Sequence, residues 1–205
     1  MLAATVRLLF WAIVFIIGRL LIKKSGHANY KNKAILAATV IILGSVSFYV
    51  PVERNILTFH SVESAFKYSN FGEIAMIING EHSDLVVWEH EKGTVSVIPK
   101  TDKGWKMSVV PKDIKLRIHN QMSIHVCKDV YSNDYYIMLH DMSNKISAVS
   151  DNKNSIFYYA DTTKNINGDV ARTYYAYAYL QDFDDSYSLN VDGDEFVLDE
   201  CKGLK

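Results

Sequence analysis

The stretch LLIKKSGHANYKNKAIL, residues 20–36, lies between two long apolar runs and carries only positive charge. Its charged residues are Lys23, Lys24, Lys31 and Lys33, and it contains no Asp or Glu. Short loops between membrane spans collect Lys and Arg when they lie in the cytoplasm. We therefore predict a helical hairpin in the cell membrane, with a cytoplasmic loop over residues 23–33 and these four lysines as its topology signals.

Both apolar runs have lengths typical of membrane spans. The first covers residues 2–22 and is interrupted only by Arg7 and Arg19, which lie near opposite ends, where long side chains reach the headgroups. The second, residues 34–51, holds no charge and ends at Pro51. A span needs about 20 residues, with a lower limit of about 17. We expect two transmembrane helices (a multi-pass chain), with the N-terminus and the C-terminal domain outside.

A cleaved signal peptide is the alternative interpretation of the first run. The apolar core of a signal peptide has about 7–15 residues, whereas this run is longer and no A-x-A-like cleavage site follows it. The lipid bilayer is therefore the first expected partner of the chain.

Charge divides the chain into the same two parts. Of the 22 basic residues, six lie in residues 1–52, whereas all 23 acidic residues lie in residues 53–205, so the two parts carry net charges of +6 and −7. Nucleic-acid binding needs a basic face, and we expect no nucleic acid as a partner of the larger part. The composition predicts a membrane hairpin over residues 1–52 and an extracytoplasmic domain over residues 53–205.

The larger part shows the pattern of a mainly antiparallel β (α+β) domain with one short N-terminal helix. In SVESAFKYS, residues 61–69, Ser61 is a good N-cap and the apolar residues fall on one side. Strand-like runs follow: EIAMIIN (73–79), DLVVWEHEK (84–92), TVSVIPK (94–100), GWKMSVV (104–110), IKLRIH (114–119), MSIHVC (122–127), YYIMLH (135–140), SIFYYA (155–160), RTYYAYAYL (172–180), SYSLNV (186–191) and EFVLD (195–199). Turn signals such as Asp192-Gly193 between the runs indicate hairpins, hence a sandwich, a barrel or a sheet with one helix on it.

Three short motifs in this part form a recognisable series: an S-x-E-x-A-F-x-Y helix, a G-E-x-S turn before a strand, and a Lys followed by G-W-K. The matching residues are Ser61, Glu63, Ala65, Phe66 and Tyr68, then Gly80, Glu81 and Ser83, then Lys100, Gly104, Trp105 and Lys106. The series resembles a group of small, uncharacterised, membrane-anchored proteins of Gram-positive-type bacteria. The resemblance extends no further than Ile114; it implies an extracytoplasmic domain and supplies no known activity.

The run RTYYAYAYL, residues 172–180, is the candidate for a ligand or partner surface. Strand alternation puts Tyr175, Tyr177 and Tyr179 on one face. Aromatic side chains spaced in this way form a flat platform for a glycan or a peptide. The alternative, which we favour, is a half-buried strand whose tyrosines pack on neighbouring strands, because aromatic residues are common in strands.

Cysteines and acidic residues supply two further candidates. Cys127 and Cys201 both fall in the domain expected outside, where disulfides persist, and the sequence leaves open whether they pair. Asp182, Asp184 and Asp185 are a weak alternative for a cation site. The histidines are scattered and show no H-E-x-x-H or comparable spacing, so we expect no metal and no cofactor.

Function is the least determined property of the sequence. It contains no G-x-S-x-G, P-loop or Rossmann glycine pattern, and we predict no catalytic residue. We expect a membrane-tethered interaction or accessory domain that binds a partner membrane protein, a cell-wall polymer or a small ligand. The alternative is a cell-surface hydrolase acting on wall or peptide substrate, which predicts a concave site that joins a histidine such as His119 or His125 to a carboxylate and a nucleophile.

Overall fold

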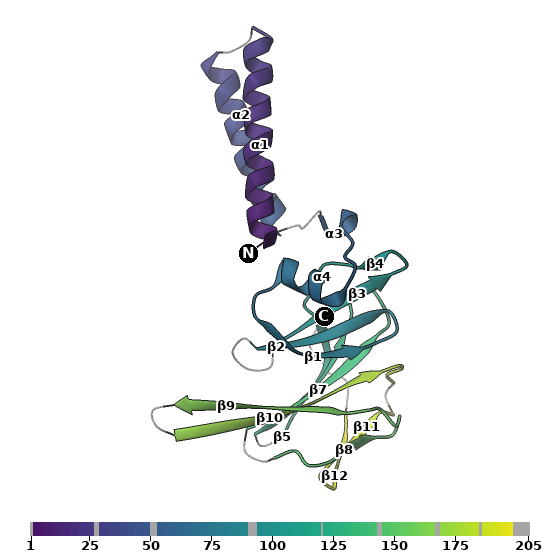
Figure 1. Ribbon diagram of the computed structural model, residues 1–205. Helices are drawn as coiled ribbons and strands as arrows, with labels where there is room; N and C mark the ends of the chain where they lie inside the picture. The colour runs from purple at the N-terminus through teal and green to yellow at the C-terminus, as the bar shows by residue number, and fades with distance from the viewer. Residues whose placement is uncertain are drawn as a thin grey trace.

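The computed structural model describes residues 2–26, 29–49, 53–89, 94–119, 121–142, 145–166, 169–184 and 186–198. Two long helices, α1 (Leu2–Lys24) and α2 (Tyr30–Tyr49), are followed by two short ones, α3 (Glu53–Ile56) and α4 (Val62–Ser69). The strands are β1 (Glu73–Asn79), β2 (Ser83–Glu89), β3 (Thr94–Thr101), β4 (Gly104–Trp105), β5 (Lys112–His119), β6 (Met122–Lys128), β7 (Tyr135–Asp141), β8 (Val149–Asp151), β9 (Tyr158–Ile166), β10 (Asp169–Leu180), β11 (Ser188–Val191) and β12 (Asp194–Val197). Figure 1 shows the long helices extending away from one end of the β domain. The prediction of an N-terminal helix followed by a mostly antiparallel β domain is confirmed.

The helices α1 and α2 pack side by side as an antiparallel pair (Figure 1). Small residues allow the close approach, because a Cβ atom at Gly18 would lie 2.8 Å from Leu36 Cδ1 and Gly44 lies against the Trp11 ring. The Trp11 indole donates a hydrogen bond of 2.9 Å to Ser47 Oγ. The pair is therefore held by both packing and a polar contact between the helices.

Only α1 is long and apolar enough to span a membrane, among the residues that the structure describes. The predicted second span, residues 34–51, is not shown as a span, because α2 begins with a polar turn and residues 50–51 lie outside the described residues. The four predicted topology signals lie at the two facing helix ends rather than in one 11-residue loop: Lys23 and Lys24 in the last turn of α1, Lys31 and Lys33 in the first turn of α2.

The short helix predicted over residues 61–69 is present as α4. Ser61 is its N-cap, with extended backbone (φ −143°, ψ 159°), and Ser61 Oγ accepts a hydrogen bond of 3.2 Å from Ser64 N. Ser64 Oγ accepts in return from Ser61 N at 3.3 Å, which completes a capping box. The buried residues of α4 form one face of the helix: Val62, Ala65, Phe66 and Tyr68.

In the described part of the chain, three antiparallel sheets build the β domain. Their strand orders are β1-β2-β3-β4, β5-β6-β7-β10-β9 and β12-β11-β8. Most neighbouring strands are consecutive in the chain and form hairpins, but β7 pairs with β10 and β8 pairs with β11. These two longer connections place β10 beside β7 in the second sheet and β11 beside β8 in the third sheet.

The short helix and the three sheets stack as four layers with three apolar cores between them. Phe66 of α4 packs on Val86 of the first sheet. The other face of that sheet carries Leu85, which packs against Tyr177 of the second sheet. The far face of the second sheet packs on Leu189 and the rest of the third sheet. Because β2 alternates between its faces, Leu85 and Val86 belong to two different cores.

Some strands differ from the prediction. The Asp192-Gly193 turn is confirmed, with positive φ values of 52° and 102° between paired strands β11 and β12. The predicted run 104–110 forms a strand only over Gly104–Trp105, and Val109 then makes an isolated antiparallel bridge with Val97 of β3. The strand β8 was not predicted, since three residues are too few for an alternation to be read. Residues 90–93, 167–168 and 199–205 lie outside the described residues.

Candidate functional site

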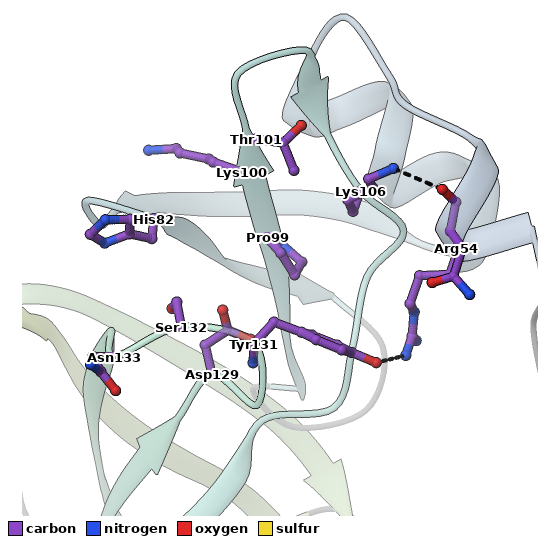
Figure 2. Close-up of a pocket in the computed structure, with 11 residues that line it drawn as sticks. Arg54, His82, Pro99, Lys100, Thr101, Lys106, Asp129, Tyr131, Ser132 and Asn133 are labelled. Carbon is purple, nitrogen blue, oxygen red and sulfur yellow. Dashed lines mark hydrogen bonds between the residues drawn. The ribbon is translucent and has the colours of Figure 1, made fainter.

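A pocket of about 520 Å³, called the Arg54 pocket below, opens between the first sheet and the loop before β7 (Figure 2). Five segments line it: Arg54 and Asn55 of α3, His82 of the β1–β2 turn, Pro99–Thr101 of β3, Lys106 after β4, and Asp129 with Tyr131–Asn133 of the loop. Its volume is in the range of small-molecule sites. The pocket is therefore the first place to look for a ligand.

Asp84 is a buried carboxylate that fixes Lys100 in one wall of the pocket. Lys100 Nζ lies 2.8 Å from Asp84 Oδ1, an ion pair without hydrogen-bond alignment, and the Asp84 side chain is 2% exposed. Trp105 Nε1 donates to Asp84 Oδ2 at 2.7 Å, and Lys100 Nζ donates to Gly80 O at 2.8 Å. The charge of Lys100 is thus compensated inside the wall.

A second buried carboxylate, Asp134, joins the first sheet to the second. His82 N and Ser83 Oγ donate to Asp134 Oδ2 at 2.7 and 2.9 Å, and Tyr179 OH donates to Oδ1 at 3.3 Å. Tyr136 OH lies 2.9 Å from Ser83 Oγ. Burial raises the pKa of Tyr136, so this phenol keeps its proton. The network holds the β1–β2 turn, and with it the pocket wall at His82, against β7 and β10.

Three of the motif residues bind these two carboxylates. Ser83 binds Asp134, and Lys100 and Trp105 bind Asp84. Gly104 has a φ of +123°, and a Cβ atom there would lie 2.3 Å from Phe59 O. In this chain these motif residues therefore fix the first sheet.

Gly80 gives the first testable consequence of this packing. A Cβ atom at Gly80 would lie 2.5 Å from Tyr136 OH, 2.7 Å from Asp134 Oδ2 and 2.8 Å from Ser83 O. We expect Gly80→Ala to lower the free energy of unfolding by about 1–3 kcal/mol, because the network around it is too tightly bonded to move. Urea unfolding of the full chain in detergent, followed by tryptophan fluorescence, measures the loss. Glu81→Ala, at the exposed next position, is the control, and an equal midpoint for the two variants would contradict the packing argument.

Arg54 and Lys106 form the opposite side of the pocket, as Figure 2 shows. Arg54 Nη1 donates to Tyr131 OH at 2.6 Å and Nη2 to a backbone carbonyl at 3.2 Å, with the guanidinium carbon 5.4 Å from the centre of the Tyr131 ring. Lys106 Nζ donates to Asn55 O at 3.4 Å and to one further carbonyl at 3.2 Å. Among the described residues, neither cation has a carboxylate partner.

Asp129 is the one carboxylate among the described residues that line the pocket. It is fully buried, and its Oδ1 accepts a hydrogen bond of 3.2 Å from Tyr131 N. Its Oδ2 has no hydrogen-bond partner within the described part of the chain. Asp129 N donates to Asp134 O at 3.0 Å, which closes the loop. The pocket therefore contains two cations that are not compensated by carboxylates and one buried anion.

The predicted tyrosine surface is wrong for two of its three residues. Tyr175 and Tyr177 are only 6% and 1% exposed and lie in the core between the first and second sheets. Tyr179 is partly buried against the same core, and its hydroxyl binds Asp134. The reason is that β10 lies inside its sheet and has a core on each face. The favoured alternative, packing on neighbouring strands, describes these tyrosines.

The predicted disulfide stays a prediction, because Cys201 lies outside the described residues. Cys127 is buried in β6, and its Sγ donates to Asp113 Oδ1 at 2.9 Å. Burial raises the pKa of the Cys127 thiol, and the Asp113 carboxylate adds to this rise. His125 Nδ1 lies 3.3 Å from Asp113 Oδ2. These three side chains have the types that the hydrolase alternative requires, but a buried, protonated thiol is a poor nucleophile.

A serine–histidine pair lies on the neighbouring strands β6 and β7. Ser123 Oγ lies 2.9 Å from His140 Nδ1, and the His140 ring stacks on Tyr175 at 5.5 Å. Burial lowers the pKa of His140, which favours the neutral ring. Neither Ser123 nor His140 lines the Arg54 pocket or the hollow of about 480 Å³ beside it at Lys128, and the side chain of His119 lies outside the described residues.

The acidic cluster proposed for a cation is engaged in other contacts. Asp184 Oδ2 accepts a hydrogen bond of 2.5 Å from Lys153 Nζ, and Ser186 N donates to Asp184 Oδ1 at 2.8 Å. Lys153 and Ser186 lower the pKa of Asp184 to about 2. Asp185 lies outside the described residues, and Asp182 is exposed. Within the described ranges, no three His, Cys, Asp or Glu side chains are placed to hold a metal ion.

Sequence reasoning missed the Arg54 pocket. The sequence identifies Lys106 only as part of the G-W-K motif. No local pattern identifies Arg54, Asp129 or Tyr131 as pocket residues, because the pocket forms from segments far apart in the chain. No protein-family model, no curated protein and no solved structure matches this chain. The function therefore rests on the geometry and charge of the molecule itself.

Proposed function

We propose that this chain is a membrane-anchored protein whose β domain lies at the outer face of the cell membrane and binds a partner or ligand through the Arg54 pocket. The observation that carries the proposal is the exposed apolar surface of the long helices. None of the residues of α1 is buried over Leu2–Lys24, and Leu8, Leu20 and Ile41 are 62%, 61% and 68% exposed. Exposure of an apolar surface of this extent to water is unfavourable, whereas a lipid bilayer covers such a surface.

The hairpin form of the anchor is supported by the packing of α2 on α1 at Trp11 and Gly18. A hairpin puts the N-terminus and the β domain on one side of the membrane. Arg7 Nε forms an ion pair with Glu53, and both side chains are less than one-fifth exposed. This contact ties the first turns of α1 to α3. The β domain is then close to the headgroups, as an accessory domain beside another membrane protein or the cell wall requires.

Binding, rather than hydrolysis, is the activity that the described residues support best. The candidate nucleophile Cys127 is buried, whereas the Arg54 pocket is open and lined by unreactive cations. The Ser123–His140 pair is the observation that favours the hydrolase alternative. That alternative requires the pair to reach solvent and to bind a serine-directed fluorophosphonate, and substitution Ser123→Ala would abolish such labelling.

Membrane topology is the first test of the proposal. Single cysteines are placed at Ser25, between the long helices, and at Ser150, an exposed position of β8, in a Cys201→Ser background. We expect a membrane-impermeant maleimide to label Ser150→Cys in intact cells and to label Ser25→Cys only after permeabilisation. Short basic segments between spans stay in the cytoplasm, which is the physical reason for this expectation.

The parent with Cys127 alone is the matched control. Its thiol is buried and its pKa is raised, so folded protein should remain unlabelled under both conditions. Labelling of Ser25→Cys but not Ser150→Cys in intact cells would place the domain in the cytoplasm. Labelling of both sites would remove the hairpin and leave a single span.

A further inference from the structure

We propose that the Arg54 pocket binds a phosphate group, carried either by a soluble small molecule or by the headgroup of a membrane lipid. This names the ligand class of the pocket and so rests on the proposed function. The pocket combines a concave surface, two cations without carboxylate partners among the described residues, and a position beside the helical anchor.

The charge of the pocket opposes that of the domain around it. Residues 53–205 carry a net charge of −7, yet three of the pocket's side chains are cationic. Lys100 is compensated by Asp84, which leaves the charges of Arg54 and Lys106. Asp129 reduces this excess, but it is fully buried and its Oδ1 is occupied by Tyr131 N. Two cations against one carboxylate leave a local positive potential, which an anion would neutralise.

The same two side chains keep hydrogen-bond donors for a ligand. A guanidinium has five N–H groups and an ammonium three. Two donations are accounted for on Arg54 and two on Lys106. Tyr131 OH accepts from Arg54, so its own proton is left to donate. Asn133 accepts from Lys128 through Oδ1, which leaves its amide NH₂. Donors from several directions suit the tetrahedral oxygens of phosphate better than a planar carboxylate.

The pocket lies at the end of the domain that faces the helical anchor, a position that both a lipid headgroup and a soluble phosphate can reach. Arg54 belongs to α3, the first helix after the long pair, and Figure 1 shows α3 at the end of the domain nearest that pair. Glu53, its neighbour, contacts Arg7 of α1. In a membrane-anchored chain this geometry places the pocket within reach of lipid headgroups, while its opening also admits soluble phosphates.

Binding is tested on the full chain in a neutral detergent, with inorganic phosphate and glycerol 3-phosphate as probes in isothermal titration. We expect both probes to bind, and Arg54→Gln and Lys106→Gln each to weaken binding by about tenfold, because each removes a charge-assisted hydrogen bond. Lys103→Gln is the matched control, since Lys103 is an exposed cation on the neighbouring β3–β4 turn and does not line the pocket. It should leave the affinity within about twofold.

A second variant keeps the test decisive if the loss of Arg54 disturbs folding. Asn133 is exposed at the mouth of the pocket, so Asn133→Trp fills the opening without removing a buried contact. It should abolish phosphate binding while the urea midpoint of the domain stays unchanged. The proposal is overturned if the wild type binds neither probe, if acetate binds as tightly as phosphate, or if Arg54→Gln and Asn133→Trp bind like the wild type.

The two sources are separated by repeating the titration in lipid nanodiscs. If the natural source is a lipid headgroup, phosphatidylglycerol in a phosphatidylcholine disc should compete and raise the apparent Kd for glycerol 3-phosphate above its value in a disc of phosphatidylcholine alone, in the wild type and in Lys103→Gln alike. If the source is soluble, the Kd is the same in both discs. Because the detergent titration does not depend on topology, a failure of phosphate binding is distinguishable from a failure of the cysteine-labelling test.

Discussion

Replacing Asp84 by alanine is expected to lower the free energy of unfolding by about 3 kcal/mol. The substitution removes a buried carboxylate and leaves the Lys100 ammonium in the pocket wall without its partner. The Asp84 side chain is 2% exposed and the Lys100 side chain 27%. Lys100 therefore keeps some contact with water, which holds the loss near the lower end of the range for broken buried pairs. The Trp105 indole also loses its acceptor at 2.7 Å. Urea unfolding of the full chain in detergent measures the change.

Companion variants divide this loss between the charge and the hydrogen bond. Asp84→Asn keeps an acceptor for Trp105 and should cost roughly half as much, because a neutral hydrogen bond survives. In Asp84→Ala/Lys100→Met no unpaired charge remains, so the double variant should be more stable than the sum of the single losses. Asp102→Ala, at an exposed carboxylate on the adjacent turn, serves as the control. Strict additivity would contradict the ion pair as the source of the effect.

The helices and hairpins were predictable because their signals are local. Ser61 marks the start of α4 within one turn, and Asp192-Gly193 supplies the positive φ values that a tight hairpin needs. The alternation of β10 also places its tyrosines on one face, as predicted. The alternation of the sequence does not show which surface of the protein packs on that face. The error over Tyr175 and Tyr177 has this origin, since only the stacking of the first sheet on the second buries them.

The Arg54 pocket lay beyond prediction for the same reason. Arg54 and Tyr131, which share a hydrogen bond, are 77 positions apart, and the fold of two sheets brings them together. The ion pair between Asp84 and Lys100 joins the two strands of a single hairpin, yet its contribution to stability also depends on the burial of Asp84. The predicted second membrane span shows the opposite limit. Its apolar run is evident, but Lys31 and Lys33 join the helix instead of the loop, because lysine is a good helix former.

The second large effect is expected at Phe66, whose replacement by alanine should cost about 3–5 kcal/mol of domain stability, because the ring fills the core between α4 and the first sheet. Phe66 is fully buried and contacts the Trp88 ring edge-on, with the centroids 5.5 Å apart. Neighbours in the first sheet, such as Val86 and Ile98, are held by sheet hydrogen bonds and cannot collapse into the space. Urea unfolding followed by Trp88 and Trp105 fluorescence reports on this core directly.

The matched control for Phe66→Ala is Phe71→Ala, which removes the same ring from a site that is 54% exposed. Because that ring is already in contact with water, its loss should stay below about 1 kcal/mol. The difference between the two variants isolates the contribution of the α4 layer. This layer also contacts α1, so Phe66→Ala should loosen the β domain from its anchor and increase proteolysis of the segment between α3 and α4. Equal losses for the two variants would mean that α4 rests on the sheet without stabilising it.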